Sequence, residues 1–220
     1  MNFTTVLAPA ALAALLATSG AHAAISIYTT QASFLAAVGS RVGVDTYDDL
    51  DFTQPLATPI SRTAGSFAYT AGAGPLSNFF PAGDVASDIW LATNNSTDTM
   101  TLNGFSAGAA AVGGLFFRSS SLGLSTATPA TINIRATDSF GVIVTQAQVN
   151  PANTSFVGFV SNGTISSIEV FVGTPGTGTA GVWPTINNLT VAAAVPEPES
   201  YALMLAGLGL VGWLVRRRSR

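Results

Sequence analysis

Alternation of apolar and polar residues recurs along the central part of the chain. This period-two pattern is typical of half-buried β-strands. Turn-forming pairs such as Asn103-Gly104, Asn150-Pro151 and Asn162-Gly163 separate several of the runs. The expected strands are 25–28, 65–70, 89–92, 99–102, 112–118, 131–136, 141–149, 155–160, 165–172 and 186–192. Many short strands at such spacing predict an all-β fold, a single antiparallel β-sandwich of jelly-roll type over residues 24–194.

One short helix is expected near the start of this domain. Thr30 can cap it, and Phe34, Leu35 and Val38 follow at helical spacing before Gly39. The rest of the domain is then strands and their connections.

Several longer segments are expected to be loops. They are the acidic stretch 45–51, the stretch around Pro55 and Pro59, and the Gly/Pro-rich stretch around Phe79-Phe80-Pro81. Residues 173–181 could be a loop within one sandwich or a linker between two domains. Because only one expected strand follows them, we favour a loop.

Residues 1–23 have the layout of a secretory signal peptide. An apolar region from about Val6 to Ala17 precedes Ala21-His22-Ala23, a small-x-small cleavage site, although no Lys or Arg comes before the apolar region. The mature chain is expected to begin near Ala24.

The C-terminal tail, residues 195–220, has three parts. The tetrapeptide Val195-Pro196-Glu197-Pro198 precedes an uncharged run from Tyr201 to Val215, and the chain closes with Arg216, Arg217, Arg218 and Arg220. As a helix, this run would span roughly 22 Å, short of the roughly 30 Å hydrocarbon core of a bilayer. The arginines should lie in the cytoplasm. The layout predicts a sorting tail that holds the protein transiently, or else a short permanent anchor.

This tail resembles the PEP-CTERM sorting signal of Gram-negative bacteria, named after the sequence that stands here as Pro196-Glu197-Pro198. The resemblance implies export, cleavage near this motif by an exosortase-type membrane protease, and release or attachment at the outer surface. It also implies an association with exopolysaccharide production. The expected partners are the export machinery, the protease, the membrane and an exopolysaccharide.

A second resemblance concerns the mature domain. Short stretches are similar to PEP-CTERM proteins whose mature part is a lectin-like or galactose-binding-like jelly roll. These stretches are 34–39, 47–50, 111–117, 155–159 and 184–189. In that family an aspartate is common where Asn187 stands here.

Composition excludes several classes of function. His22 is the only histidine and leaves with the signal peptide, and the chain has no cysteine and no lysine. Ser-His-Asp and Cys-His catalysis and His/Cys zinc sites are therefore excluded. With four arginines against nine acids, the mature domain also lacks the basic footprint of a nucleic-acid binder. A carboxylate pair could still act on glycosides, but nothing nominates one, and we expect no enzyme.

Asp45, Asp48, Asp49 and Asp51 form the best candidate for a specific site. Closely spaced oxygen ligands suit Ca²⁺, and the expected ligands are Asp48 and Asp49 with the amide carbonyl of Asn187. The alternative is a solvated loop with turn-forming aspartates.

Aromatic residues supply candidates for sugar binding. Trp183 follows the 173–181 loop, and one of the adjacent Phe79 and Phe80 could face outward. Packing in the core is the alternative, and it is favoured for Trp90. Three classes of function remain open: a non-catalytic structural component of the matrix or envelope, a carbohydrate-binding module that could depend on calcium, and a glycoside-active enzyme.

Overall fold

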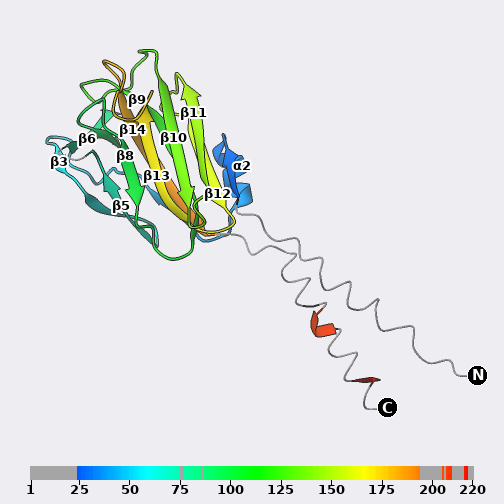
Figure 1. Cartoon of the computed structure of the whole chain (residues 1–220). Coiled ribbons are helices and arrows are strands. Elements are labelled where there is room, and N and C mark those ends of the chain that lie inside the picture. Colours follow the sequence, from blue (N-terminus) through cyan, green and yellow to red (C-terminus); the bar gives the residue numbers. More distant parts are fainter. Residues whose placement is uncertain are drawn as a thin grey trace, which may run out of the picture.

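Two antiparallel β-sheets face each other across one apolar core (Figure 1). The computed structural model describes residues 24–74, 77–85, 87–193, 205, 207–209 and 216–217. The eight-stranded sheet has the order β1 (Ile25–Tyr28), β12 (Phe156–Ser161), β9 (Ala109–Ser119), β14 (Trp183–Ala193), β7 (Asp88–Thr93), β6 (Asn78–Val85) and β3 (Leu56–Ala57), and β2 (Val42–Asp45) also pairs with β14. The six-stranded sheet has the order β11 (Ile143–Val149), β10 (Thr131–Asp138), β13 (Ile165–Val172), β8 (Met100–Asn103), β5 (Phe67–Gly72) and β4 (Ile60–Ala64). The predicted all-β sandwich is confirmed.

The main core lies between the two sheets because alternate residues of each strand point inward. On β10, Ile132, Ile134 and Ala136 are fully buried, whereas the residues between them are partly exposed. Phe116 and Phe159 from the eight-stranded sheet belong to the same buried cluster. The period-two pattern of β10 thus places its alternate side chains in the core, whereas β9 and β12 are buried on both faces.

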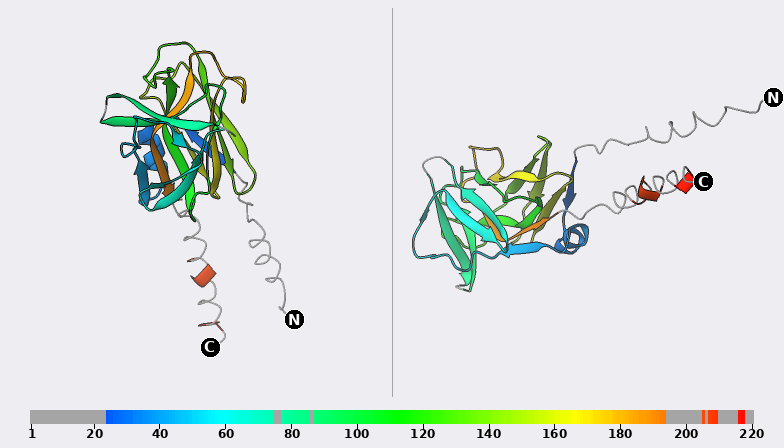
Figure 2. Two further views of the ribbon diagram at one scale, coloured as in Figure 1. Left: turned by 90° about the vertical axis from the view of Figure 1, so that its left-hand side faces the viewer. Right: turned by 90° about the horizontal axis from the view of Figure 1, so that it is seen from below.

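Helix α2 (Gln31–Ala37) covers part of the outer face of the eight-stranded sheet (Figure 2). As predicted, Thr30 is the N-cap, and its hydroxyl accepts a hydrogen bond from Ser33 N at 3.2 Å. Phe34 is fully buried against Phe156. A Cβ added at Gly158 would lie 2.3 Å from the Phe34 ring, so only glycine lets the helix sit this close.

Trp90 and Phe117 form a second cluster on this outer face, with their rings edge to face and 5.1 Å between centroids. The loop after β9 covers them, since Trp90 Nε1 donates to Gly123 O at 2.9 Å. The prediction that Trp90 belongs to the core is confirmed.

Strands β3, β4 and β6 correct the expectation that these parts of the chain are loops, and β2 is a further strand that was not predicted. Pro81 and Gly83 obscured β6, whose alternation is weak. Pro81 pairs with Leu91 on β7 but lies beyond the two residues through which β6 pairs with β3. A proline is tolerated there because little pairing is required on that side. Residues 173–181 connect β13 to β14 within the one sandwich, as favoured.

The two ends of the domain leave from the same end of the sandwich. Ser26 lies opposite Val160, Val160 opposite Ala111, and Ala111 opposite Ala192, in one row across the sheet. Trp183 begins the eleven-residue β14, so at about 3.3 Å per residue it lies roughly 33 Å from the end of that strand.

Candidate functional site

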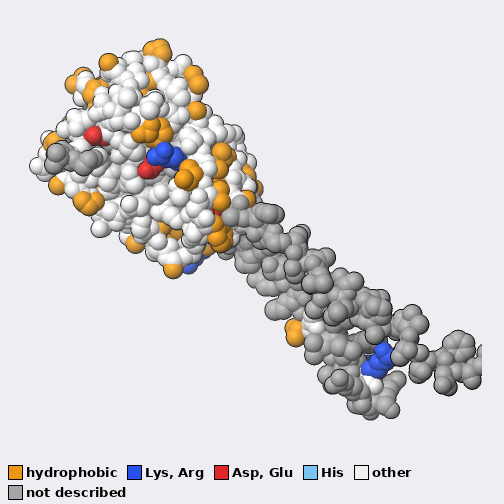
Figure 3. Space-filling view, in the orientation of Figure 1, with side chains coloured by type: hydrophobic (Ala, Val, Ile, Leu, Met, Phe, Trp, Pro, Cys, Tyr) orange, Lys and Arg blue, Asp and Glu red, His pale blue; other side chains and the backbone are white. Residues whose placement is uncertain are grey.

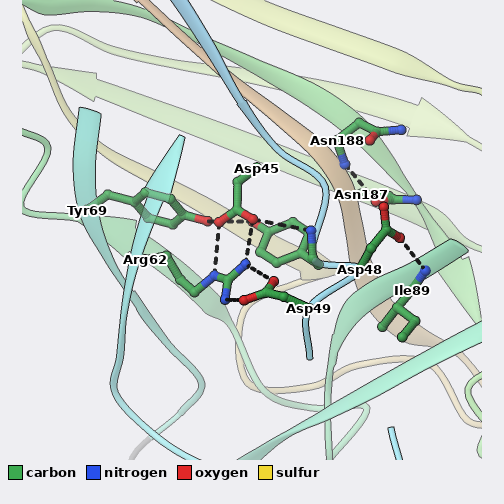
Figure 4. Close-up of polar contacts among 9 residues, drawn as sticks. Asp45, Asp48, Asp49, Arg62, Tyr69, Ile89, Asn187 and Asn188 are labelled. Carbon is green, nitrogen blue, oxygen red and sulfur yellow. Dashed lines mark hydrogen bonds and ion pairs between the residues drawn. The ribbon is translucent and has the colours of Figure 1, made fainter. Parts of the chain in front are cut away.

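The acidic stretch 45–51 is organised by Arg62 of β4. Arg62 Nε donates to Asp45 Oδ2 at 2.9 Å and Nη2 to Asp45 Oδ1 at 2.6 Å. The other side of the guanidinium donates to Asp49, from Nη1 at 2.9 Å and from Nη2 at 2.7 Å (Figure 4). One arginine thus bridges two carboxylates with the fork geometry that makes such pairs strong.

Two buried tyrosines complete this network. The Tyr69 hydroxyl donates to Asp45 Oδ2 at 2.7 Å and lies 2.9 Å from the Tyr47 hydroxyl. Tyr47 has φ of 63° and donates its backbone N–H to Asp45 Oδ1 at 3.2 Å. Burial, reinforced by negatively charged Asp45, raises the pKa of the Tyr47 phenol, and burial likewise raises that of Tyr69. Both phenols therefore stay neutral, and Tyr69 anchors the carboxylate directly while Tyr47 bonds to the Tyr69 hydroxyl.

An open pocket of about 530 Å³ adjoins the network and is lined in part by Asp45, Asp49, Arg62 and Tyr69. Hydrogen bonds from Arg62 are the main cause that lowers the pKa of Asp49, which is largely exposed. The charges in this pocket are thus already paired, with a single arginine shared between two acids.

The predicted calcium ligands point to different partners. Asp48 Oδ1 accepts from Ile89 N at 3.0 Å, while Asp49 is bound by Arg62 (Figure 4). Asn187 is buried, and its Nδ2 donates to Asp88 Oδ1 at 2.7 Å. Within the described ranges, no group of three or more Asp, Glu, His or Cys residues is placed to hold a metal ion.

The bulge in β14 explains the position of Asn187. The register with β9 shifts between Asn187 and Thr190, and Asn188 has φ of 50°. Asn188 N donates to Asn187 Oδ1 at 2.7 Å. The side-chain amide of Asn187 therefore accepts a hydrogen bond that stabilises the bulge and donates another to Asp88. Calcium binding by Asp48, Asp49 and Asn187 stays a prediction, and it would require these contacts to rearrange.

The candidate sugar-binding aromatics divide into two environments. Phe79 is fully buried in the main core and offers no face to a ligand, so its place among the candidates is corrected. Phe80 and Trp183 are partly exposed and line the same small pocket of about 50 Å³. Trp183 Nε1 donates to Asn94 O at 3.2 Å. Ser120 and Ser121 complete the polar side of this pocket.

A further open pocket, of about 560 Å³, lies over the six-stranded sheet. Arg135 and Glu169 are cross-strand neighbours and form an ion pair there. Asp98 also lines this pocket, and within the described part of the chain its Oδ2 is buried without a hydrogen-bond partner. The alternation around Ile168 and Val170 predicted that Glu169 faces outward, and the structure confirms this.

Sequence reasoning missed Arg62, Tyr47 and Tyr69. One signal was present, because the domain has only four arginines for nine acids. An arginine close in sequence to four aspartates is a natural partner for them, yet which two it binds depends on how β4 and β2 pack.

The tail and the signal peptide lie mostly outside the described residues. This holds for the cleavage residues Ala21 and Ala23, for Val195, Pro196, Glu197 and Pro198 of the sorting motif, and for Arg218 and Arg220. Leu205, residues 207–209, Arg216 and Arg217 are helical and exposed. Among the described positions, no helix has both the length and the apolar composition that are needed to cross a membrane.

The fold and the tail together define an exported protein with a β-sandwich domain. Residues 194–218 match the family model of the PEP-CTERM protein-sorting motif. The chain therefore carries a PEP-CTERM sorting motif at its C-terminal end, and this motif implies export, processing by exosortase-type membrane machinery, and a surface or extracellular location. No curated protein and no solved structure matches the chain significantly. The resemblance to lectin-like jelly rolls stays a prediction.

Proposed function

We propose that the exported sandwich is a non-catalytic structural component of the cell envelope or of an exopolysaccharide matrix. The observation that supports this most strongly is that the acidic side chains are already engaged in contacts within the domain. In residues 24–193, eight of the nine carboxylates accept hydrogen bonds or ion pairs within the domain, and Asp98 is the exception. The eight are Asp45, Asp48, Asp49, Asp51, Asp84, Asp88, Asp138 and Glu169.

Acid–base catalysis on glycosides needs two carboxylates that face each other across the substrate. Asp98 and Glu169 line one pocket, but Glu169 is paired with Arg135. Figure 3 shows scattered apolar side chains and few charges on the face in view, which otherwise consists of uncharged side chains and backbone. Such a surface suits contact with a hydrated polysaccharide better than it suits chemistry.

The arrangement of the chain ends supports the same role. Because both ends leave one end of the sandwich, a molecule held by its tail presents the opposite end outward. Phe80 and Trp183 lie toward that opposite end. The domain is thus displayed away from the membrane until the tail is processed.

The test compares the native host with a strain lacking this gene. We expect the protein in the surface or matrix fraction, and a mechanically weaker matrix without it. A control strain with Pro196, Glu197 and Pro198 all replaced by alanine should mislocalise the protein and give the same weak matrix. Exopolysaccharide incubated with the purified protein should keep its chain length; shortening would instead support the glycoside-active enzyme.

Carbohydrate binding is the second candidate, and the shared pocket of Phe80 and Trp183 favours it. Partly exposed aromatic rings beside hydroxyl groups are suited to stacking against sugar rings. In a glycan-array screen, binding that Trp183→Ala abolishes and Trp183→Phe retains would support this function. An array without specific binding would leave the structural role.

A further inference from the structure

Strand β11 differs from the other strands that end a sheet. Strands β1 and β2 have four residues each and β3 has two. Strand β4 carries Arg62. By contrast, β11 has seven residues, Ile-Val-Thr-Gln-Ala-Gln-Val, and pairs with β10 in an unbroken register.

Natural sheet edges are usually blunted by charges, prolines, bulges or short length, because open backbone groups invite pairing with another chain. Strand β11 has none of these features. No charged residue occurs between Asp138 and Glu169. Ile143 and Val149, at its two ends, are 61% and 75% exposed. The edge is therefore uncharged, regular and apolar at both ends.

The hydrogen bonds that flank β11 show which of its backbone groups point outward. Asn150 N donates to Ala130 O at 2.9 Å, and Asp138 N donates to Val142 O at 3.1 Å. Antiparallel pairs alternate between hydrogen-bonded and non-hydrogen-bonded. The even-numbered residues of β11 therefore bond to β10. The N–H and C=O groups of Ile143, Thr145, Ala147 and Val149 point away from it, along the open edge.

We propose that β11 pairs in antiparallel fashion with β11 of a second copy of this chain, about a two-fold axis at Gln146. Ile143 then lies opposite the partner's Val149, and Thr145 lies opposite the partner's Ala147. These are the residues whose backbone groups point outward, so each pair exchanges two hydrogen bonds. The exposed apolar side chains at both ends of the strand meet each other.

Gln146 suits the centre of this pairing. It lies opposite itself in a non-hydrogen-bonded pair, where side chains approach most closely. Its Nε2 now donates to Ala147 O at 3.0 Å, an oxygen on the open edge. Pairing supplies that oxygen with a backbone N–H and releases the amide to bond to the partner's Gln146.

A two-fold pairing closes on itself, so the product is a dimer with one sheet continuous across both copies and not an open fibre. Helix α2 packs mainly against β12, β1 and β9, on the other sheet. The proposed pairing is inferred from the geometry of β11 alone. It does not depend on the proposed role in the matrix.

Sedimentation velocity of the exported protein, over a range of concentrations, tests the proposal. We expect a dimer that dissociates on dilution. The double variant Thr145→Lys/Ala147→Lys places lysines opposite each other across the axis and should be monomeric with an unchanged melting temperature. The matched control, Ser61→Lys/Thr63→Lys, adds the same charge to exposed positions of the opposite edge strand β4 and should still dimerise.

Hydrogen exchange on the unmodified protein gives a readout that does not depend on a variant folding. The backbone amides of Thr145 and Ala147 should be protected at concentrations where the dimer forms, and should exchange rapidly on dilution. A wild-type protein that stays monomeric at every concentration would overturn the proposal. So would a dimer in which these two amides exchange rapidly.

Discussion

Arg62 binds both carboxylate oxygens of Asp45, through Nε at 2.9 Å and Nη2 at 2.6 Å. Asp45 is 4% exposed, and the arginine side chain is 12% exposed. The contact joins the end of β2 in one sheet to β4 in the other, close to the edge of the sandwich. Because Arg62 also binds Asp49, the carboxylates of the acidic stretch 45–51 are partly engaged in structural contacts and not all available to a ligand.

Asp45→Asn should destabilise the fold. Removing one partner of a buried ion pair leaves the other charge poorly compensated, which costs about 3 kcal/mol. Urea unfolding should show a lower midpoint with an unchanged slope. Asp51→Asn is the matched control, because Asp51 is exposed and, among the described residues, its side chain bonds locally to Thr53 and Gln54. Equal midpoint shifts in the two variants would contradict a special role for Asp45.

Tyr47 and Tyr69 should ionise only when the domain unfolds. Burial raises the pKa of both phenols above the value of about 10 that is expected in the unfolded chain. The folded state therefore holds its phenolic protons when the unfolded state loses them. Stability is fully present below about pH 10 and falls as the pH rises further.

An alkaline titration can follow this by tyrosinate absorbance and by circular dichroism on the same sample. The absorbance change of these two tyrosines should coincide with loss of the β-sheet signal, and Tyr47→Phe should reduce its amplitude. If both phenols ionised near pH 10 while the sheet signal persisted, their burial in the network would be refuted.

Calcium binding predicts a higher melting temperature with Ca²⁺ than with a chelator. The effect should disappear in Asp48→Asn, since the Asp48 carboxylate is a proposed ligand and its only hydrogen bond to a described residue is from Ile89 N. Asp84→Asn, a change of equal charge in another part of the domain, is the control. Identical melting temperatures with calcium and with chelator would end the hypothesis.

Processing of the tail predicts a shortened C-terminus. Mass spectrometry of the surface-located protein should find an end near Pro196-Glu197-Pro198, and an N-terminus near Ala24. A protein that still ends at Arg220 would show that the tail serves as an anchor instead.

Most of the regular strands could be predicted because alternation reports directly on a half-buried sheet. Strand β10 is an example, with Ile132 and Ile134 inside and Asn133 and Arg135 outside. Strand β6 was not predicted because Pro81 and Gly83 interrupt its alternation. A proline is tolerated in this strand because the pairing with β3 is short and does not reach Pro81. The acidic cluster was visible, but its partner was not, since Arg62 reaches Asp45 only when the two sheets are stacked.

By itself, the sequence determined the sorting signal of this protein and its fold class. The sorting motif, the apolar run and the arginines form one continuous segment, and strand alternation is equally local, so neither needs contacts between distant residues. Tertiary structure alone decided which acids are bound by Arg62, that Phe79 is buried while Phe80 and Trp183 share a pocket, and that β11 is left at an open edge. These outcomes depend on the order of strands in each sheet and on the stacking of the sheets, which bring together residues far apart along the chain.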